Sequence, residues 1–162
     1  IYPGTGRAED IGAGKGKGFT VNVPLPSGAD DQAYERIFKN IVFPLARQFR
    51  PQLILRNGGS DPHFADSLTG LGLTLAGFWM IGDKVRQLSD ELCKGKSVDL
   101  ICSGYNPDVL PRAWISLLAG LSGMTHPFPE SPLPEASCPD AEIDAVINDV
   151  RNALKSFWSI GP

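Results

Sequence analysis

The sequence predicts an α/β fold built on a parallel β-sheet. Short apolar runs typical of strands alternate with longer stretches in which apolar residues recur at helical spacing. Strands that alternate with helices pair in parallel, because each helix returns the chain to the same end of the sheet. Two polar loops also lie between a strand-like run and a helical one, which is where open parallel sheets bind ligands.

The first predicted strand covers residues 19–25 (FTVNVPL), which are rich in β-branched side chains. A helix follows, with Asp30 or Asp31 as its N-cap. Pro44 is expected to kink or shorten this helix, and Arg50-Pro51 is expected to end it. Its apolar positions are Tyr34, Ile37, Phe38, Ile41 and Leu45.

The second and third predicted strands, residues 52–56 and 98–101, enclose another helix. Thr74 can cap that helix, and Gly95 can close it, since glycine is common just beyond helix ends. Three strands make a small parallel sheet. Because such sheets are normally buried on both faces, we expect further strands to extend this one.

The rest of the chain is predicted to be helical on both sides of an extended crossing. One helix begins near Asp108, residues 125–139 are dense in proline, and a last helix begins near Asp140.

The composition limits the possible functions. The chain has 162 residues, a hydrophobic fraction of 42% and a formal net charge of −3. It carries no basic stripe for nucleic acid and no apolar run near the roughly 20 residues that span a membrane, so we expect neither partner. The three cysteines (Cys93, Cys102 and Cys138) lack a C-x-x-C spacing, so we expect no disulfide framework and a cytoplasmic location.

Two loops carry the candidate functional residues. Residues 57–63 (NGGSDPH) follow the second predicted strand, and residues 102–107 (CSGYNP) follow the third. We therefore expect Asp61 and Tyr105 at the same edge of the sheet, where a carboxylate can hold a metal and a phenol can stabilise developing negative charge. The alternatives are a turn role for Asp61 and a packing role for Tyr105, and His63 fits either a metal or a backbone hydrogen bond.

Several motifs, in the same order, resemble those of zinc-dependent histone deacetylases, acetoin-utilisation proteins and acetylpolyamine amidohydrolases. The similarity is collinear from Tyr2 to about Gly120, which makes it far more specific than any single motif. The matching segments are residues 2–6 (YPGTG), 10–12 (DIG), 20–25 (TVNVPL), 58–63 (GGSDPH, similar to G-F-D-A-H), 66–68 (DSL, similar to D-P-L), 73–74 (LT) and 104–106 (GYN, similar to G-G-Y-N).

This resemblance implies the arginase/deacetylase fold, a three-layer α/β/α sandwich with a parallel sheet. It implies that Asp61 is a zinc ligand and that Tyr105 is the tyrosine that stabilises the transition state. It further implies that Tyr2, Leu68 and Gly104 bind substrate. The backbone near Phe19 would bind a monovalent cation such as K⁺.

The sequence departs from the family pattern in three respects. Cys102-Ser103 stands where the family usually has glycine or Glu-Gly, and Ser67 replaces the usual proline. The family's other two zinc ligands and its general-base histidine pair lie upstream of the Y-P-G-T-G segment, with which this sequence begins. We therefore expect residues 1–162 to be the C-terminal half of one deacetylase domain, incomplete in fold. Within it, residues 1–18 form an active-site loop region, 19–124 a strand and helix core, and 125–162 the crossing and last helix.

The predicted function is removal of acetyl groups from acetylated lysine or polyamine amines, with zinc completed by ligands outside this sequence. The N-terminal half of the domain, in cis or as a separate chain, is the expected partner, and the half alone is expected to be inactive. One alternative is a non-catalytic pseudo-enzyme or partner subunit of the same fold. A ureohydrolase is less favoured, because a two-metal site needs several carboxylates and the loop around Asp61 offers one.

Overall fold

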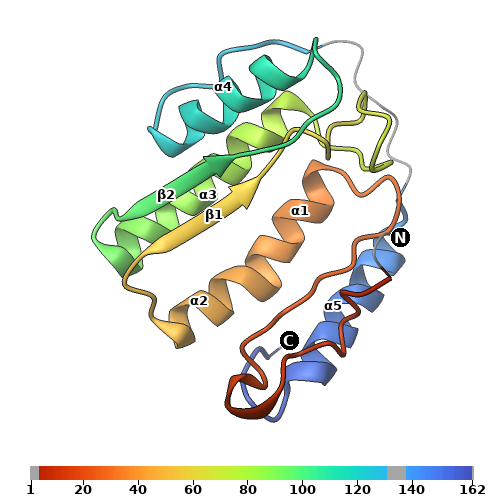
Figure 1. Cartoon of the computed structure of the whole chain (residues 1–162), viewed down its shortest axis with the longest axis vertical. Coiled ribbons are helices and arrows are strands. Elements are labelled where there is room, and N and C mark those ends of the chain that lie inside the picture. The colour runs from red at the N-terminus through yellow and green to blue at the C-terminus, as the bar shows by residue number, and fades with distance from the viewer. Residues whose placement is uncertain (1–3, 131–137, 162) are drawn as a thin grey trace.

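The computed structural model describes residues 4–130 and 138–161, so Tyr2 lies outside the described residues. The described part alternates helices and strands (Figure 1). In chain order the elements are η1 (Gly14–Gly16), α1 (Asp31–Ile37), η2 (Phe38–Val42), α2 (Phe43–Phe49), β1 (Ile54–Gly58), α3 (Leu75–Cys93), β2 (Ser97–Ile101), α4 (Leu110–Leu121) and α5 (Asp140–Leu154).

Two of the three predicted strands are confirmed, and they pair in parallel. β1 and β2 are joined through α3, and Arg56 lies opposite Asp99 in the register. The Arg56 guanidinium makes a close ion pair with that carboxylate, with Nε 2.8 Å from Oδ1. Because the two strands run in the same direction, the loops that follow them leave from one edge of the sheet.

The strand predicted for residues 19–25 is wrong. The sheet of the described residues contains β1 and β2, and this segment joins neither. Its apolar side chains, among them Val21 and Val23, instead pack against the hydrophobic core. β-branched residues favour a strand only where a neighbouring strand supplies the hydrogen-bond ladder, and no described strand lies beside this segment to do so.

The predicted helix boundaries are largely confirmed. The Asp30 carboxylate accepts a hydrogen bond from the Ala33 N–H at 3.0 Å, and the Thr74 hydroxyl caps α3 through the Gly77 N–H at 3.2 Å. The helical path continues through Pro44 because η2, a π-helical turn, immediately precedes α2, and Pro44 then occupies the first turn of α2. A proline is tolerated there because it needs no N–H partner.

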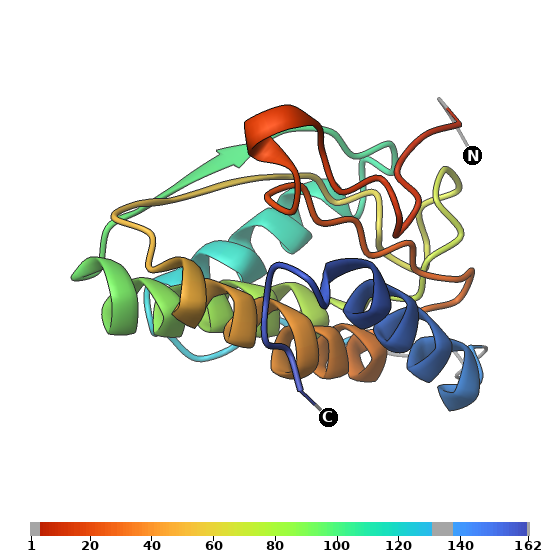
Figure 2. The same cartoon turned by 90° about the horizontal axis from the view of Figure 1, so that it is seen from below.

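The α-helices lie on one side of the strands, so the described residues form a sheet and one layer of α-helices (Figure 2). One core joins α1 and α5, and a second joins α3 and α4. The backbones of α3 and α4 approach each other closely at two glycines, Gly82 and Gly120. A Cβ added at either glycine would overlap the backbone of the other helix. This arrangement represents part of the expected three-layer sandwich.

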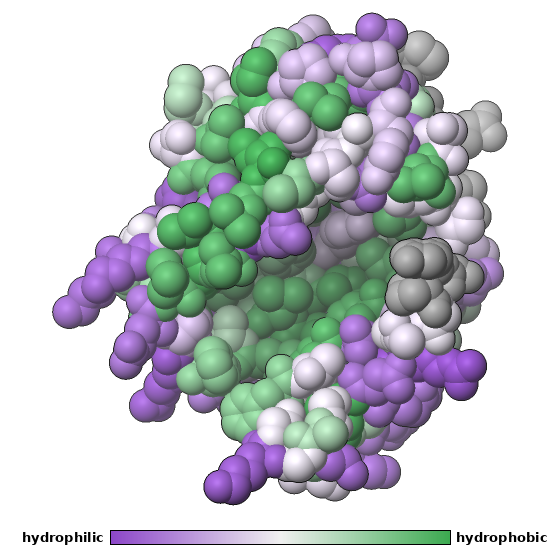
Figure 3. Space-filling model, viewed as in Figure 1, coloured by the Kyte–Doolittle hydropathy of each residue, from purple (hydrophilic) through white to green (hydrophobic). Residues whose placement is uncertain are grey.

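The other face of the sheet is open and apolar. Its apolar side chains Leu55, Val98 and Leu100 are 63%, 46% and 45% exposed, and they alternate along β1 and β2 with less exposed residues. Figure 3 shows an extensive apolar surface on this side of the molecule, with a hollow at its centre. Every helix among residues 4–130 and 138–161 is either too short or too polar to span a lipid bilayer.

Candidate functional site

The loops that follow β1 and β2 lie side by side and are hydrogen-bonded to each other. The Cys102 N–H donates to the Gly58 carbonyl at 2.9 Å, and the Ser60 N–H donates to the Ser103 carbonyl at 3.2 Å. These bonds continue the strand pairing beyond the sheet. The structure therefore brings the Asp61 and Tyr105 loops together at the edge where the sequence places them.

The Asp61 carboxylate is held in place from the neighbouring loop. The Ser103 hydroxyl donates to Asp61 Oδ1 at 2.7 Å, and the Thr69 hydroxyl donates to the Asp61 carbonyl at 2.7 Å. Ser103 has a φ of 66°, in the left-handed region that favours glycine. Ser103 therefore holds one oxygen of Asp61 in a hydrogen bond from a backbone conformation that favours glycine.

Glycine is required where the two loops touch. Gly104 has a φ of 136°, and a Cβ at this position would overlap the Ser60 hydroxyl oxygen. That hydroxyl is buried and has no hydrogen-bond partner among the described residues. The predicted substrate-binding residue Gly104 thus lies directly against the loop that carries Asp61.

Tyr105 is fixed through its backbone rather than its side chain. Its N–H donates to Asp66 Oδ2 at 2.8 Å, while its side chain is 62% exposed. Leu68, also exposed, donates its N–H to Asp66 Oδ1 at 3.0 Å. The buried Asp66 carboxylate therefore links two of the predicted site residues, although Asp66 was not itself among them.

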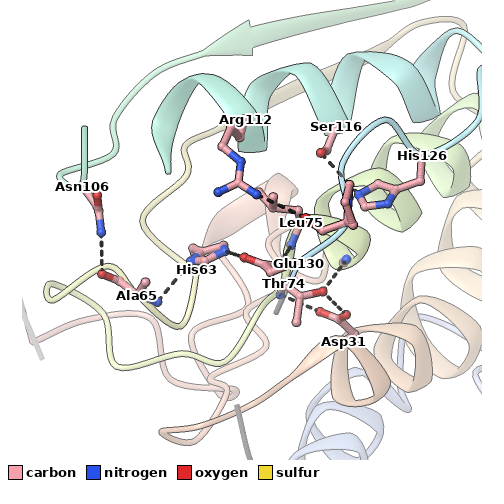
Figure 4. Close-up of polar contacts among 12 residues, drawn as sticks. Asp31, His63, Ala65, Thr74, Leu75, Asn106, Arg112, Ser116, His126 and Glu130 are labelled. Atoms are coloured by element: carbon pink, nitrogen blue, oxygen red, sulfur yellow. Dashed lines mark hydrogen bonds and ion pairs between the residues drawn. The ribbon is translucent and has the colours of Figure 1, made fainter. Parts of the chain in front are cut away.

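His63 is a buried structural residue. Its Nδ1 accepts the Ala65 N–H at 3.1 Å, and its Nε2 lies 2.8 Å from Glu130 Oε1 (Figure 4). An accepting Nδ1 places the proton on Nε2, so the ring is a neutral donor to Glu130. The other Glu130 oxygen accepts the Leu75 N–H at 2.7 Å. Of the two roles open to His63, the geometry supports the structural one, because a metal would have to displace one of these partners.

Tyr34 on α1 is a neighbour of the site that the sequence did not reveal. Burial of the phenol, and then the negative charge of Asp61, raise the pKa of Tyr34 to about 12. Its place on the apolar face of the helix suggested only packing. Burial is the larger cause of this raised pKa, and the charge of Asp61 adds to it.

Phe19 is not brought together with Asp61 and Tyr105. Its exposed ring packs edge-on against Phe49 and Trp158, with centroid distances of 6.2 and 5.4 Å. Phe49 ends α2, just before the start of β1, whereas Asp61 and Tyr105 follow the other ends of the strands. Cation binding by the backbone near Phe19 remains a prediction.

The described residues fit a metal only in part. They contain no group of three or more His, Cys, Asp or Glu side chains that could hold an ion. Asp61 offers one carboxylate, and no described residue donates a hydrogen bond to its Oδ2. Catalytic zinc usually has three protein ligands, so Asp61 fits as one ligand of a site and does not form one alone.

Comparisons with known proteins indicate the family of this chain. Residues 1–121 match the family model described as histone deacetylase domain. The chain is 33% identical to a "Probable deacetylase" of Archaeoglobus fulgidus, covering 98% of this chain and 46% of that protein. It is 35% identical to "Histone deacetylase 14, chloroplastic" of Arabidopsis thaliana, covering 98% of this chain and 36% of that protein.

A solved structure shows the same fold. The crystal structure of the HDA15 HD domain superposes with a TM-score of 0.82 at 28% identity, covering 98% of this chain and 40% of that one. The predicted fold class is therefore confirmed as part of the arginase/deacetylase fold. The chain spans less than half the length of these curated relatives.

Proposed function

Because the chain belongs to the histone deacetylase domain family, we propose that it forms part of a zinc-dependent amidohydrolase that deacetylates lysine or polyamine amines. The reaction would convert an acetamide and water into a free amine and acetate. The observation that carries the proposal is the hydrogen-bonded contact between the loops of Asp61 and Tyr105 at the ends of β1 and β2.

Each residue of this site has a proposed role. Asp61 supplies one carboxylate ligand to zinc, which when bound would polarise the amide carbonyl and activate a water. Tyr105 donates its phenolic hydrogen to the developing oxyanion, a contact typically worth about 10²- to 10³-fold in rate. The exposure of its side chain supports this role, since the phenol is accessible to a substrate. Leu68, Gly104 and Tyr2 would contact the substrate, and the backbone near Phe19 would bind K⁺.

We propose that polypeptide outside this sequence, in cis or as a separate chain, completes the site. It would supply the remaining zinc ligands and the histidine that takes the water's proton, so the isolated chain would be inactive. Two observations support this proposal: the single carboxylate ligand, and the open apolar face of β1 and β2. Three cysteines without a disulfide support a reducing location such as the cytoplasm.

The test uses the complete protein, meaning the natural polypeptide or complex that contains this chain. Turnover of an acetyl-lysine peptide and of an acetylated polyamine is measured together with zinc content. Tyr105→Phe is expected to lower kcat by about 10²-fold or more with zinc retained. Asp61→Ala should lose both zinc and activity. Asp108→Ala, which alters an exposed aspartate on the Tyr105 loop, is the matched control and should change neither.

Two results would contradict the proposal. Undiminished turnover in Tyr105→Phe would remove the assigned role of the phenol. A complete protein that binds zinc stoichiometrically but turns over neither substrate would favour the pseudo-enzyme alternative.

A further inference from the structure

We propose that Asp66 is a positioning residue for Tyr105: its carboxylate holds the backbone of the Tyr105 loop against the Asp61 loop and thereby sets the direction of the phenol. This inference rests on the proposed function, because it assumes that the phenol contacts the reacting group. Asp66 itself would touch neither substrate nor metal and would act through Tyr105.

The hydrogen bonds of Asp66 join two loops that are distant in sequence. Oδ2 accepts the N–H of Tyr105 at 2.8 Å and that of Asn106 at 3.0 Å, and Oδ1 accepts the N–H of Leu68 at 3.0 Å. The residue is 3% exposed. Hydrogen bonds to an ionised acceptor are about twice as strong as neutral ones, and burial removes the competition from water.

A second contact fixes the same loop. The Asn106 side-chain amide donates to the carbonyl of Ala65, the residue before Asp66, at 2.8 Å (Figure 4). The Asn106 side-chain oxygen accepts the Asp108 N–H at 3.0 Å. Asn106 thus ties the Tyr105 loop to the Asp61 loop and also shapes the turn into α4. Two restraints therefore hold the backbone at Tyr105: the Asp66 carboxylate, and the Asn106 side chain bonded to the Ala65 carbonyl.

The Tyr105 side chain has no comparable restraint. It is 62% exposed, and no described residue hydrogen-bonds to its hydroxyl. The two preceding residues, Ser103 and Gly104, have φ values of 66° and 136°, which lie outside the common regions of backbone conformation. The position of the phenol thus depends on the backbone, and a displacement of about 1 Å can lower a rate by about 10²-fold.

A neutral side chain of the same shape cannot replace the carboxylate. Within the described residues, no lysine, arginine or histidine forms an ion pair with Asp66, and the buried charge is met by three backbone N–H groups. In Asp66→Asn one oxygen becomes an NH₂ group, so at least one backbone N–H would face another donor. The variant should loosen the Tyr105 loop while it preserves the volume of the side chain.

The experiment combines kinetics with hydrogen exchange on the complete protein. Asp66→Asn is expected to lower kcat for an acetyl-lysine peptide by about 10- to 10²-fold with little change in KM or zinc content. Amide hydrogen exchange should become faster at whichever of the three N–H groups of Leu68, Tyr105 and Asn106 the new NH₂ group faces. Asp108→Asn makes the same chemical change at an exposed side chain of this loop and should leave both measurements unchanged.

A double-mutant cycle separates positioning from general structural damage. If Asp66 acts through the phenol, adding Asp66→Asn to Tyr105→Phe should lower kcat by less than about twofold further. An equal loss in both backgrounds would overturn the proposal, because the effect would then not pass through the phenol. Unchanged exchange at all three of Leu68, Tyr105 and Asn106 would also overturn it, because the carboxylate would then not hold these N–H groups.

The outcomes also distinguish this inference from the proposed function. If Tyr105→Phe alone leaves turnover intact, the proposed function fails. If amide hydrogen exchange is nevertheless faster in Asp66→Asn, the contact between the two loops is only structural. Should Asp66→Asn fail to fold, Asn106→Ala removes the neighbouring tie to Ala65 and keeps the carboxylate. It should lower kcat in the wild-type background and not in Tyr105→Phe, and equal losses would again count against positioning.

Discussion

Glu130→Gln is expected to destabilise the protein much more than the same change at a surface glutamate. In the structure both Glu130 oxygens accept hydrogen bonds, from His63 Nε2 at 2.8 Å and from the Leu75 N–H at 2.7 Å. Glutamine offers one oxygen and one NH₂ group, so one of these two donors would face another donor. A change of His63 tautomer cannot relieve this conflict, because Nδ1 already accepts the Ala65 N–H.

The expected loss follows from these contacts. A buried donor left without a partner costs about 1–3 kcal/mol. Removing a negative charge at the N-terminus of α3 adds about 0.3–1 kcal/mol. The free energy of unfolding of Glu130→Gln should therefore fall by about 1–4 kcal/mol. The loss should be accompanied by faster hydrogen exchange at Leu75.

Urea unfolding of the complete protein measures this loss, with Glu91→Gln as the matched control. Glu91 pairs with Arg47 at the surface, where both side chains are exposed and an ion pair contributes little, so its substitution should cost much less stability than Glu130→Gln. If Glu130→Gln were as stable as Glu91→Gln, the buried network of Glu130 would not stabilise the fold, and the reasoning above would be refuted.

Three further predictions concern the site. The pKa of Tyr34 is raised to about 12, so the protonated phenol stabilises the fold fully below pH 10, and this contribution is lost as the pH rises through 12. In a titration followed by tyrosinate absorbance, Tyr34 should ionise near pH 12. The Tyr34→Phe variant should lack both this ionisation step and the alkaline loss of stability. Gly104→Ala should lower the free energy of unfolding, measured by thermal unfolding, by about 1–3 kcal/mol, because the new Cβ would overlap the Ser60 hydroxyl and the φ of this residue favours glycine. Adding Ser60→Gly to Gly104→Ala should recover part of this loss. If Ser60→Gly recovered nothing, the overlap with Ser60 would not be the cause. Calorimetric titration of the isolated chain should show no stoichiometric sub-micromolar zinc binding, since Asp61 alone supplies too few ligands; tight binding that depends on Asp61 would mean that the ligand set is misjudged.

Local patterns in the sequence predicted most of the secondary structure. The apolar runs before the two polar loops became β1 and β2, and Asp30 and Thr74 cap helices as expected. These features depend on residues within a few positions of one another, so the sequence contains the information needed to predict them. Residues 19–25 were misassigned because strand formation also needs a neighbouring strand, which no local pattern reports.

The candidate site was predicted in part. The order of strands and helices in a parallel sheet places Asp61 and Tyr105 at one edge, since that relation is topological. It did not reveal the contacts that hold them. Asp66 joins Tyr105 across 39 positions, Ser103 joins Asp61 across 42, and Glu130 joins His63 across 67.

The sequence by itself therefore determined the family, the alternation of elements and the edge at which the functional loops meet. Only the tertiary structure decided that His63 is buried in a polar network, that Asp66 holds the Tyr105 backbone and that one face of the sheet is open and apolar. The physical reason is that periodicity and capping depend on the local chain, whereas a polar group's partner and a side chain's burial depend on which distant segments pack beside it.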